Sequence, residues 1–369
     1  MNPVHHRTTH TQTKEQTMKS IPTRRIVAGI GAAAAVALTL TSCAAATPGS
    51  SSSGSAAASG GTSKNYSIAY LPKNLGNPYF DASDKAGEEA VKSFGGTYKE
   101  VGPQQASADG QVQYINTLTQ QKTGAIVLSA NDVNALCTAI GQARSAGVKV
   151  VTFDSDTKPG CRDVYVSASS TDLIGQKQID IMAGQIGDSG QIAILSAAAN
   201  ATNQNAWIEV MKSYAAEKYP NIKIVATVYG NDDDQTSYDK TQALLSQYPD
   251  LKGIISPTTV GISAAARYLD SKDSDVKLTG LGVPSQMAKY VKDGTVPEFA
   301  LWNPEDLGKL AAFASKALID GTITGKEGDE FTAEGLTNKT TDYKVGADGV
   351  ITLGEPFVFD KSNVDQFKF

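Results

Sequence analysis

From Tyr66 onward, short apolar segments alternate with segments of about ten to fifteen residues that have helical character. Residues 67–71, 125–130 and 148–153 are typical of buried strands. Strands that alternate with helices in this way predict βαβ units and a parallel sheet covered on both faces. The same order restarts after residues 163–168, so two α/β halves of ordinary domain size are the simplest interpretation.

A signal-like segment precedes this region. Basic residues lie before an apolar run at 26–40, whose 15 residues fall short of the roughly 20 needed to span a bilayer. We therefore predict a signal peptide over residues 1–42, with Met18 as the better initiator. The run closes on Leu-Thr-Ser-Cys, which resembles a bacterial lipobox, so lipidation of Cys43 is expected. An ordinary secreted protein with an unmodified Cys43 is the alternative.

Residues 44–63 are rich in serine, glycine and alanine and offer nothing that could form a core. We interpret residues 43–65 as a lipidated cysteine followed by a flexible tether. The folded part would then be extracytoplasmic and held at the cell membrane only through its lipid anchor.

Loss of the signal segment changes which chemistry is available. All three histidines (His5, His6 and His10) lie within it, so the mature chain would have none. This excludes Ser-His-Asp and Cys-His catalytic sites and histidine-ligated metals, and we expect no cofactor. Five basic residues and one acidic residue also leave, which moves the formal net charge from −5 to −9. An acidic chain without a basic run argues against nucleic acid as a partner.

Two cysteines, Cys137 and Cys161, remain in the mature chain. In an exported protein such a pair is most simply a disulfide, and without histidine it is a poor zinc site. The acidic stretch 231–239 has calcium-loop character but lacks the required glycine and closing glutamate, so we interpret it as a solvated loop.

Polar and aromatic residues follow the predicted strands at their carboxyl ends, where doubly wound α/β domains bind ligands. Carboxylate and amide groups can each bind adjacent sugar hydroxyls, and an aromatic ring can stack on the apolar face of a sugar. The cluster therefore indicates a polyhydroxylated small molecule. Simpler interpretations remain open for single residues: Asp154 and Asn203 as helix caps, Asn77 as part of a turn, and Tyr79 and Phe80 as core residues.

Five motifs, "SIAYLPKNLGNPYFD", "VVTFDSDTKPGCR", "ATNQNAW", "IISPTTVG" and "FALWNPEDLG", together resemble the sugar-binding lipoproteins of ABC importers. These belong to the type 1 periplasmic-binding family, and the motifs are most similar to its rhamnose-binding members and its autoinducer-2 receptors. The resemblance covers 66–369. It implies an α/β fold of two Rossmann-like, doubly wound domains joined by a hinge, with the ligand clamped between them.

In this resemblance the first lobe would comprise 66–168 plus about 304–330, and the second 169–303 plus about 331–369. Three crossing segments would join the lobes, near Ala168, near Trp302 and before the C-terminal tail. A monomer that passes its sugar to an ABC permease is expected.

The resemblance also implies binding residues. Lys73, Asp154, Gln204 and Pro257 match the hydrogen-bonding positions of autoinducer-2 receptors, while two positions depart from them. Asn203 stands where those receptors have aspartate and Thr259 where they have alanine, and both changes look more like the rhamnose-binding members. The two cysteines match a disulfide in these relatives. The full predicted ligand-binding set is Lys73, Asn77, Tyr79, Phe80, Asp154, Asp156, Asn203, Gln204, Pro257, Thr259, Trp302 and Asn303.

The predicted function is therefore a binding lipoprotein that captures L-rhamnose or a similar deoxysugar and carries out no chemical step. An autoinducer-2 receptor of the same fold is the alternative. A glycosidase that pairs Asp154 with Asp156 is disfavoured, because two carboxylates on one turn need not flank a common bond.

Overall fold

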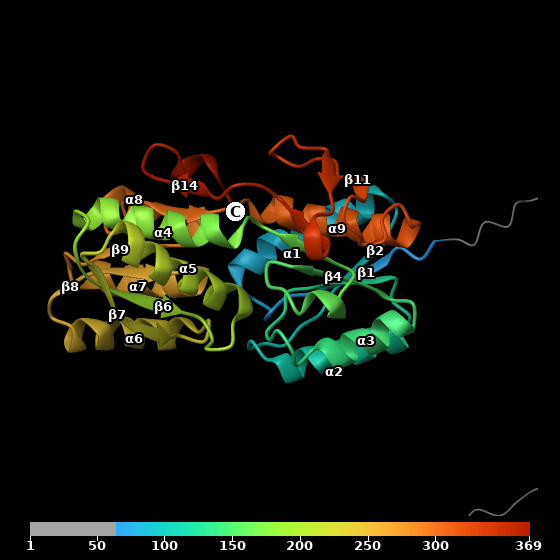
Figure 1. The fold of residues 1–369 in the computed structure, drawn as a ribbon, viewed down its shortest axis with the longest axis horizontal. Coiled ribbons are helices and arrows are strands. Elements are labelled where there is room, and N and C mark those ends of the chain that lie inside the picture. Colours follow the sequence, from blue (N-terminus) through green and yellow to red (C-terminus); the bar gives the residue numbers. More distant parts are fainter. Residues whose placement is uncertain (1–63) are drawn as a thin grey trace, which may run out of the picture. The chain divides into compact units, whose positions relative to one another are not determined.

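The computed structural model describes residues 64–369 (Figure 1). The expected signal peptide, the lipidated Cys43 and the tether up to residue 63 lie outside the described residues. From residue 64 onward, no helix is both long enough and apolar enough to cross a membrane.

The first lobe is built on a six-stranded sheet in the order β13-β5-β4-β3-β1-β2, in which every pair is parallel. Helices α1 and α9 cover one face and α2 and α3 the other (Figure 1). Strand side chains alternate between the two faces, so that Tyr70 packs under α1 and α9 while Leu71 packs under α2 and α3. The bounds are β1 Ser67–Leu71, α1 Pro78–Ser93, β2 Thr97–Glu100, α2 Ala108–Gln120, β3 Ala125–Leu128, α3 Cys137–Ser145, β4 Lys149–Phe153, β5 Val164–Ser167, α9 Pro304–Asp320 and β13 Val350–Thr352.

The second lobe has a parallel four-stranded sheet in the order β7-β6-β8-β9. The pair α4 and α5 lies on one face, and α6 and α7 lie on the other (Figure 1). The bounds are α4 Thr171–Ile186, β6 Gly190–Ser196, α5 Thr202–Lys218, β7 Ile222–Tyr229, α6 Asp234–Gln247, β8 Leu251–Ser256, α7 Thr259–Ser271, β9 Lys277–Gly280 and α8 Pro284–Asp293.

Two antiparallel pairs complete the described chain. Strand β10 (Phe299–Leu301) pairs with β14 (Phe357–Phe359), and β11 (Glu330–Thr332) pairs with β12 (Asp342–Lys344). The two parallel sheets with their covering helices confirm the predicted α/β fold of two doubly wound lobes.

The chain passes between the lobes at three places. The first two lie between β5 and α4, close to Ala168, and between β10 and α9, close to Trp302. The third lies at 353–356, inside the C-terminal tail and not before it. Strand β13 pairs with β5 and buries Ile351 completely, so Val350–Thr352 belong to the first sheet, whereas the sequence had assigned them to the second lobe. The remaining lobe boundaries stay a prediction.

Helix α3 begins at Cys137, after a turn at residues 133–136. Oδ1 of Asp132 accepts hydrogen bonds from the backbone N–H groups of Asn134 and Ala135, both at 2.8 Å. The Val133 carbonyl oxygen accepts from the Lys158 N–H at 3.1 Å, and the Cys137 N–H donates to the Asn134 oxygen instead, so the regular helical bonding starts only after this turn.

Candidate functional site

A cavity of about 370 Å³ lies where the carboxyl ends of strands from both sheets meet. Ten of the twelve predicted binding residues line it, namely Lys73, Asn77, Tyr79, Phe80, Asp154, Asn203, Gln204, Pro257, Thr259 and Trp302.

A larger groove lies between α1, α9 and β11 on the outside of the first lobe. It contains none of the residues that follow the sheet strands, and its polar groups are surface side chains such as Glu89 and Lys309. We therefore assign the ligand site to the smaller cavity between the lobes.

Lys73 connects the two lobes across the cavity. Its Nζ donates a hydrogen bond to Oδ1 of Asn203 at 3.0 Å and lies 3.8 Å from Oδ2 of Asp154. The Lys73 side chain is only 6% exposed. A buried ammonium group is tolerated only when it is paired and hydrogen-bonded, so Asp154 and Asn203 together keep this charge in place.

Asp154 is held in an unusual backbone conformation directly after β4. Its φ is 58°, in the left-handed region that aspartate tolerates better than most residues. Ser129 Oγ donates to its Oδ2 at 2.7 Å, and the Tyr165 hydroxyl donates to its main-chain oxygen at 2.9 Å. These contacts fix both the carboxylate and the turn that carries it.

The first turn of α5 supplies Asn203 and Gln204 from the second lobe. Asn203 Oδ1 accepts from the Gln204 backbone N–H at 2.9 Å as well as from Lys73. Oε1 of Gln204 accepts from Ser196 Oγ at 2.7 Å and from the Ala197 N–H at 2.8 Å. With that oxygen occupied, the Gln204 amide nitrogen is the group left to donate toward the cavity.

Aromatic rings form part of the cavity wall. Trp302 Nε1 donates to the Tyr79 hydroxyl at 2.8 Å, and the two rings are perpendicular with centroids 6.1 Å apart. Phe80 packs edge-on against Phe153. Tyr79 and Phe80 are therefore core residues and cavity-lining residues at once. Burial raises the pKa of Tyr79 well above its usual value, and the neighbouring Asp154 carboxylate adds to that shift.

Two predicted residues lie outside this cavity. Both carboxylate oxygens of Asp156 accept from Arg162, from Nε at 3.0 Å and from Nη2 at 2.7 Å. Asn303 caps α9 by accepting from the Glu305 N–H at 2.9 Å, and it donates to Thr337 Oγ1 at 3.0 Å. In both cases the side chain makes hydrogen bonds within the protein that stabilise the loop that carries it.

Sequence reasoning missed Asp232, Trp207 and Thr258, which also line the cavity. The loop that contains Asp232 was interpreted as solvated, but Thr258 Oγ1 donates to the Asp232 carboxylate. Burial raises the pKa of Asp232, while the nearby Lys73 ammonium opposes that shift. The sequence could have identified Asp232 as a site residue from its position shortly after β7, because it then lies at the same edge of the second sheet as the other site residues.

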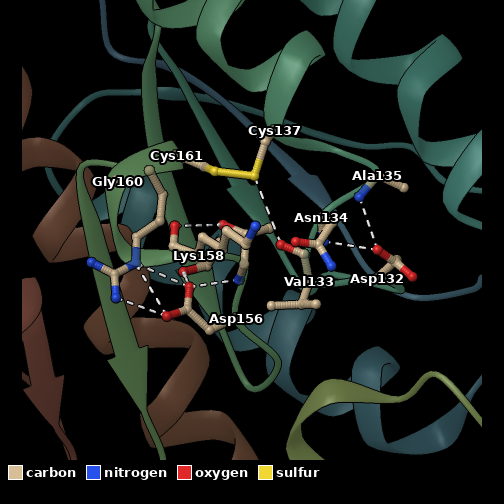
Figure 2. The surroundings of a disulfide bond; sticks show 12 residues. Asp132, Val133, Asn134, Ala135, Cys137, Asp156, Lys158, Gly160 and Cys161 are labelled. Atoms are coloured by element: carbon tan, nitrogen blue, oxygen red, sulfur yellow. Dashed lines mark hydrogen bonds and ion pairs between the residues drawn. A yellow bond between two sulfur atoms is a disulfide. The ribbon is translucent and has the colours of Figure 1, made fainter.

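The predicted disulfide is present and joins the first residue of α3 to the short helix Pro159–Cys161 (Figure 2). It closes a loop of 24 residues between Cys137 and Cys161. Beside it, backbone N–H groups lower the pKa of Asp132 by donating to its Oδ1. Asp132 Oδ2 accepts from Asn200 Nδ2 of the second lobe at 3.4 Å, so the disulfide braces a loop that contacts the other lobe.

The two-lobed α/β architecture with a cavity at the strand ends defines a small-molecule binding protein. Residues 68–323 match the family described as periplasmic binding protein domain, and the chain belongs to that family. It is a family of binding proteins rather than of enzymes. Across residues 64–369, no group of three or more histidine, cysteine, aspartate or glutamate side chains is placed to hold a metal ion.

Solved structures with similar folds are also similar in sequence. A sugar ABC transporter structure from Actinomyces odontolyticus is 45% identical, with coverage of 82% of this chain and 97% of its own and a TM-score of 0.67. A solute-binding protein from Clostridium phytofermentas with bound L-rhamnose is 40% identical, with coverages of 81% and 97% and a TM-score of 0.78. LsrB from Clostridium saccharobutylicum in complex with AI-2 is 26% identical, with coverages of 82% and 99% and a TM-score of 0.77.

Proposed function

We propose that this chain is the sugar-binding component of an ABC importer and that its ligand is L-rhamnose or a closely similar deoxysugar. The observation that carries the proposal is the 40% identity, over 81% of the chain, to a solute-binding protein with bound L-rhamnose. The protein captures the sugar between its lobes and releases it to a membrane permease.

The chemistry of the cavity supports a neutral, hydroxylated ligand. The Lys73 charge is balanced by Asp154, so the cavity has no unpaired cation to select an anionic sugar. The Gln204 amide and the Tyr79 hydroxyl can donate to sugar oxygens, and carboxylate oxygens of Asp154 and Asp232 can accept from sugar hydroxyls. Phe80, Trp207 and Trp302 provide apolar surface for the C–H face and the methyl group of a deoxysugar.

An autoinducer-2 receptor is less well supported. The AI-2-bound LsrB has a similar fold but only 26% identity, compared with 40% for the L-rhamnose-bound relative. Asn203 and Thr259 line the cavity, and they stand where the autoinducer-2 receptors are expected to have aspartate and alanine.

The location is part of the proposal. We infer that residues 1–42 direct export and that a lipid on Cys43 anchors the protein outside the membrane, with residues 44–63 as the tether. Mass spectrometry of the membrane-associated protein tests this directly. A diacylglyceryl group on an N-terminal Cys43 is expected, and an unmodified, freely secreted chain would contradict it.

The ligand is tested by calorimetric titration against L-rhamnose, L-fucose, D-ribose, D-arabinose and AI-2. L-rhamnose is expected to bind most tightly and to raise the melting temperature, because a ligand of the native state stabilises it. The double variant Asn203→Asp, Thr259→Ala should lose L-rhamnose affinity, whereas Asn221→Asp, an exposed site on the second lobe, should not. Preferential binding of AI-2 by the unaltered protein would overturn the proposal in favour of the receptor.

A further inference from the structure

The cavity between the lobes has two ends of different chemistry. The second sheet has the order β7-β6-β8-β9, and Leu281, directly after β9, extends it by a bridge to Ala300 of β10. Asp232 follows β7 at the opposite end of this order. Neighbouring strands lie about 4.8 Å apart, so three strand spacings separate β7 from β9. Because Asp232 and Leu281 both line the cavity, it extends along the carboxyl edge of the whole second sheet.

The charged groups gather at the end of the cavity near β7 and β6. Lys73 Nζ lies 3.8 Å from Asp154 Oδ2 and donates to Asn203 Oδ1 at 3.0 Å. The Asp232 carboxylate accepts from Thr258 Oγ1 and lies close enough to Lys73 for the ammonium charge to act on it. The groups that suit sugar hydroxyls are therefore concentrated around Lys73.

Apolar side chains line the other end, where β9 and β10 finish side by side. Leu281 directly follows β9, Leu301 is the last residue of β10, and Trp302 comes next in the chain. All three line the cavity. The cavity leaves its lining residues little exposed surface: Leu281 and Trp302 are each 3% exposed, and Lys73 is 5% exposed. Leu281 thus keeps as large a fraction of its surface as the indole ring that forms the neighbouring wall.

The hydrogen-bond donors at the apolar end are already occupied. The Leu281 N–H donates to the Ser256 oxygen at 3.0 Å, and the Gly282 N–H donates to an oxygen of β10 at 3.1 Å. Trp302 Nε1 donates to the Tyr79 hydroxyl at 2.8 Å. A sugar hydroxyl placed here would leave water without gaining a bond from any of these groups, whereas a methyl group would only bury apolar surface.

We propose that Leu281, Leu301 and Trp302 form a methyl-binding end of the cavity, which selects 6-deoxysugars over sugars that carry a hydroxymethyl group. The ring hydroxyls lie toward Lys73 and Asp154, and the methyl group on C5 of the sugar packs against Leu281. This inference rests on the proposed function, because it assumes that the cavity holds a deoxysugar.

Three sugars that differ at a single position test the selectivity on the unaltered protein. L-rhamnose has a methyl group on C5, L-mannose has a hydroxymethyl group there, and L-lyxose has only hydrogen, while the ring hydroxyls keep the same configuration. In calorimetric titrations, L-mannose and L-lyxose should each bind about tenfold or more weaker than L-rhamnose, the first because its extra hydroxyl finds no donor and the second because it lacks the methyl contact.

The outcomes separate this inference from the proposed function. If L-rhamnose binds but either of the other two sugars binds as tightly, the methyl-binding end is wrong and the proposed function stands. If none of the three binds, the inference and the assignment of L-rhamnose are overturned together.

A matched pair of substitutions tests the role of Leu281. Valine and threonine have the same branched shape and differ by one hydroxyl group, so Leu281→Val and Leu281→Thr separate polarity from volume. The threonine hydroxyl can bond the hydroxymethyl group, so the preference for L-rhamnose over L-mannose should be about threefold or more smaller in Leu281→Thr than in Leu281→Val.

The readout is a ratio of two affinities on one protein, so a loss of stability in either variant does not change it. Leu245→Thr, at a half-buried position on α6 that does not line the cavity, is the control and should keep the preference of the unaltered protein. Equal preferences in the two Leu281 variants would show that Leu281 does not contact this part of the sugar, and would overturn the inference.

Discussion

Lys73 Nζ of the first lobe donates a hydrogen bond to Asn203 Oδ1 of the second lobe at 3.0 Å, with Asp154 Oδ2 3.8 Å away. One buried ammonium thus links the carboxyl edges of two separate sheets. Both partners also line the proposed sugar site, so this contact between the lobes lies within the site itself.

The first prediction concerns Lys73→Met. The substitution keeps most of the side-chain volume but removes the charge, which leaves the buried Asp154 carboxylate without its counter-ion. Truncation of one partner of a buried charge pair typically costs about 2–5 kcal/mol. L-rhamnose affinity should therefore fall by about 30-fold or more in a calorimetric titration. Lys85→Met on the exposed side of α1 is the control, and equal effects of the two substitutions would contradict the role of Lys73.

The second prediction concerns the disulfide. In the chain-entropy view, a cross-link that closes a loop of 24 residues stabilises the fold by about 3 kcal/mol. Cys137→Ser with Cys161→Ser should lower the urea midpoint accordingly. Sugar affinity should fall only modestly, because the braced loop touches the second lobe through Asp132 and Asn200 and does not line the cavity.

The control for this prediction is reduction. A reducing agent should destabilise the unaltered protein to the level of the double serine variant and should have no further effect on that variant. A double serine variant as stable as the unaltered protein would show that packing around α3, and not the cross-link, sustains this loop.

The sequence predicted most of the residues that line the candidate site for two reasons. Side chains that follow parallel strands gather at one edge of a sheet, and the resemblance to sugar-binding lipoproteins pointed to Lys73, Asp154, Gln204 and Pro257. The sequence could not tell which of Asp154 and Asp156 lines the cavity, since both follow β4 within one turn. Their roles diverge because Arg162, on the far side of the turn, takes the second carboxylate and not the first. Asp154 itself has a left-handed backbone conformation, which the local sequence pattern does not predict.

Asp232 was missed for a related reason. Its stretch is as acidic and polar as a solvated loop, and the groups that interact with it in the cavity are Thr258 on a different βα turn and Lys73 on the other lobe. The position of β13 is likewise a tertiary effect. Three residues far along the chain complete the first sheet because β5 would otherwise be its edge strand.

The third prediction concerns Asp84, a fully buried carboxyl group on α1 whose Oδ2 has no partner among the described residues. Ser83 Oγ lies 2.7 Å from Asp84 Oδ1 and 3.1 Å from the Phe80 carbonyl oxygen. One hydroxyl proton cannot serve both acceptors, but a neutral Asp84 can donate to Ser83 while Ser83 donates to Phe80. Burial raises the pKa of Asp84 well above its usual range, in agreement with a neutral acid.

The sign of the pH effect follows from that shift. The folded state keeps a proton that the unfolded state releases above a pH of about 4, so the group's contribution to stability falls as pH rises toward the folded pKa. Relative to Asp84→Asn, the free energy of unfolding of the unaltered protein should drop by up to about 1.4 kcal/mol per pH unit over that window. Denaturant titrations from pH 4 to 8 measure it. Asp109→Asn, on the exposed start of α2, should show no such divergence, and parallel pH profiles for Asp84→Asn would contradict the neutral acid.

The last prediction separates the two neighbouring carboxylates that open the turn after β4. Asp154→Asn keeps a residue that tolerates the left-handed backbone, so the fold should survive, but the carboxylate beside Lys73 is lost. Sugar affinity should fall by about tenfold or more, and the melting temperature should also fall because the buried Lys73 ammonium loses its counter-ion. Asp156→Asn leaves the Arg162 guanidinium, whose side chain is 1% exposed, without its counter-ion and should cost about 3–5 kcal/mol of stability. Its sugar affinity, measured below the new melting temperature, should stay within about twofold because Asp156 lies outside the cavity. The two variants should therefore both lose stability but differ in sugar affinity, and a loss of affinity in Asp156→Asn equal to that in Asp154→Asn would place both carboxylates in the binding site.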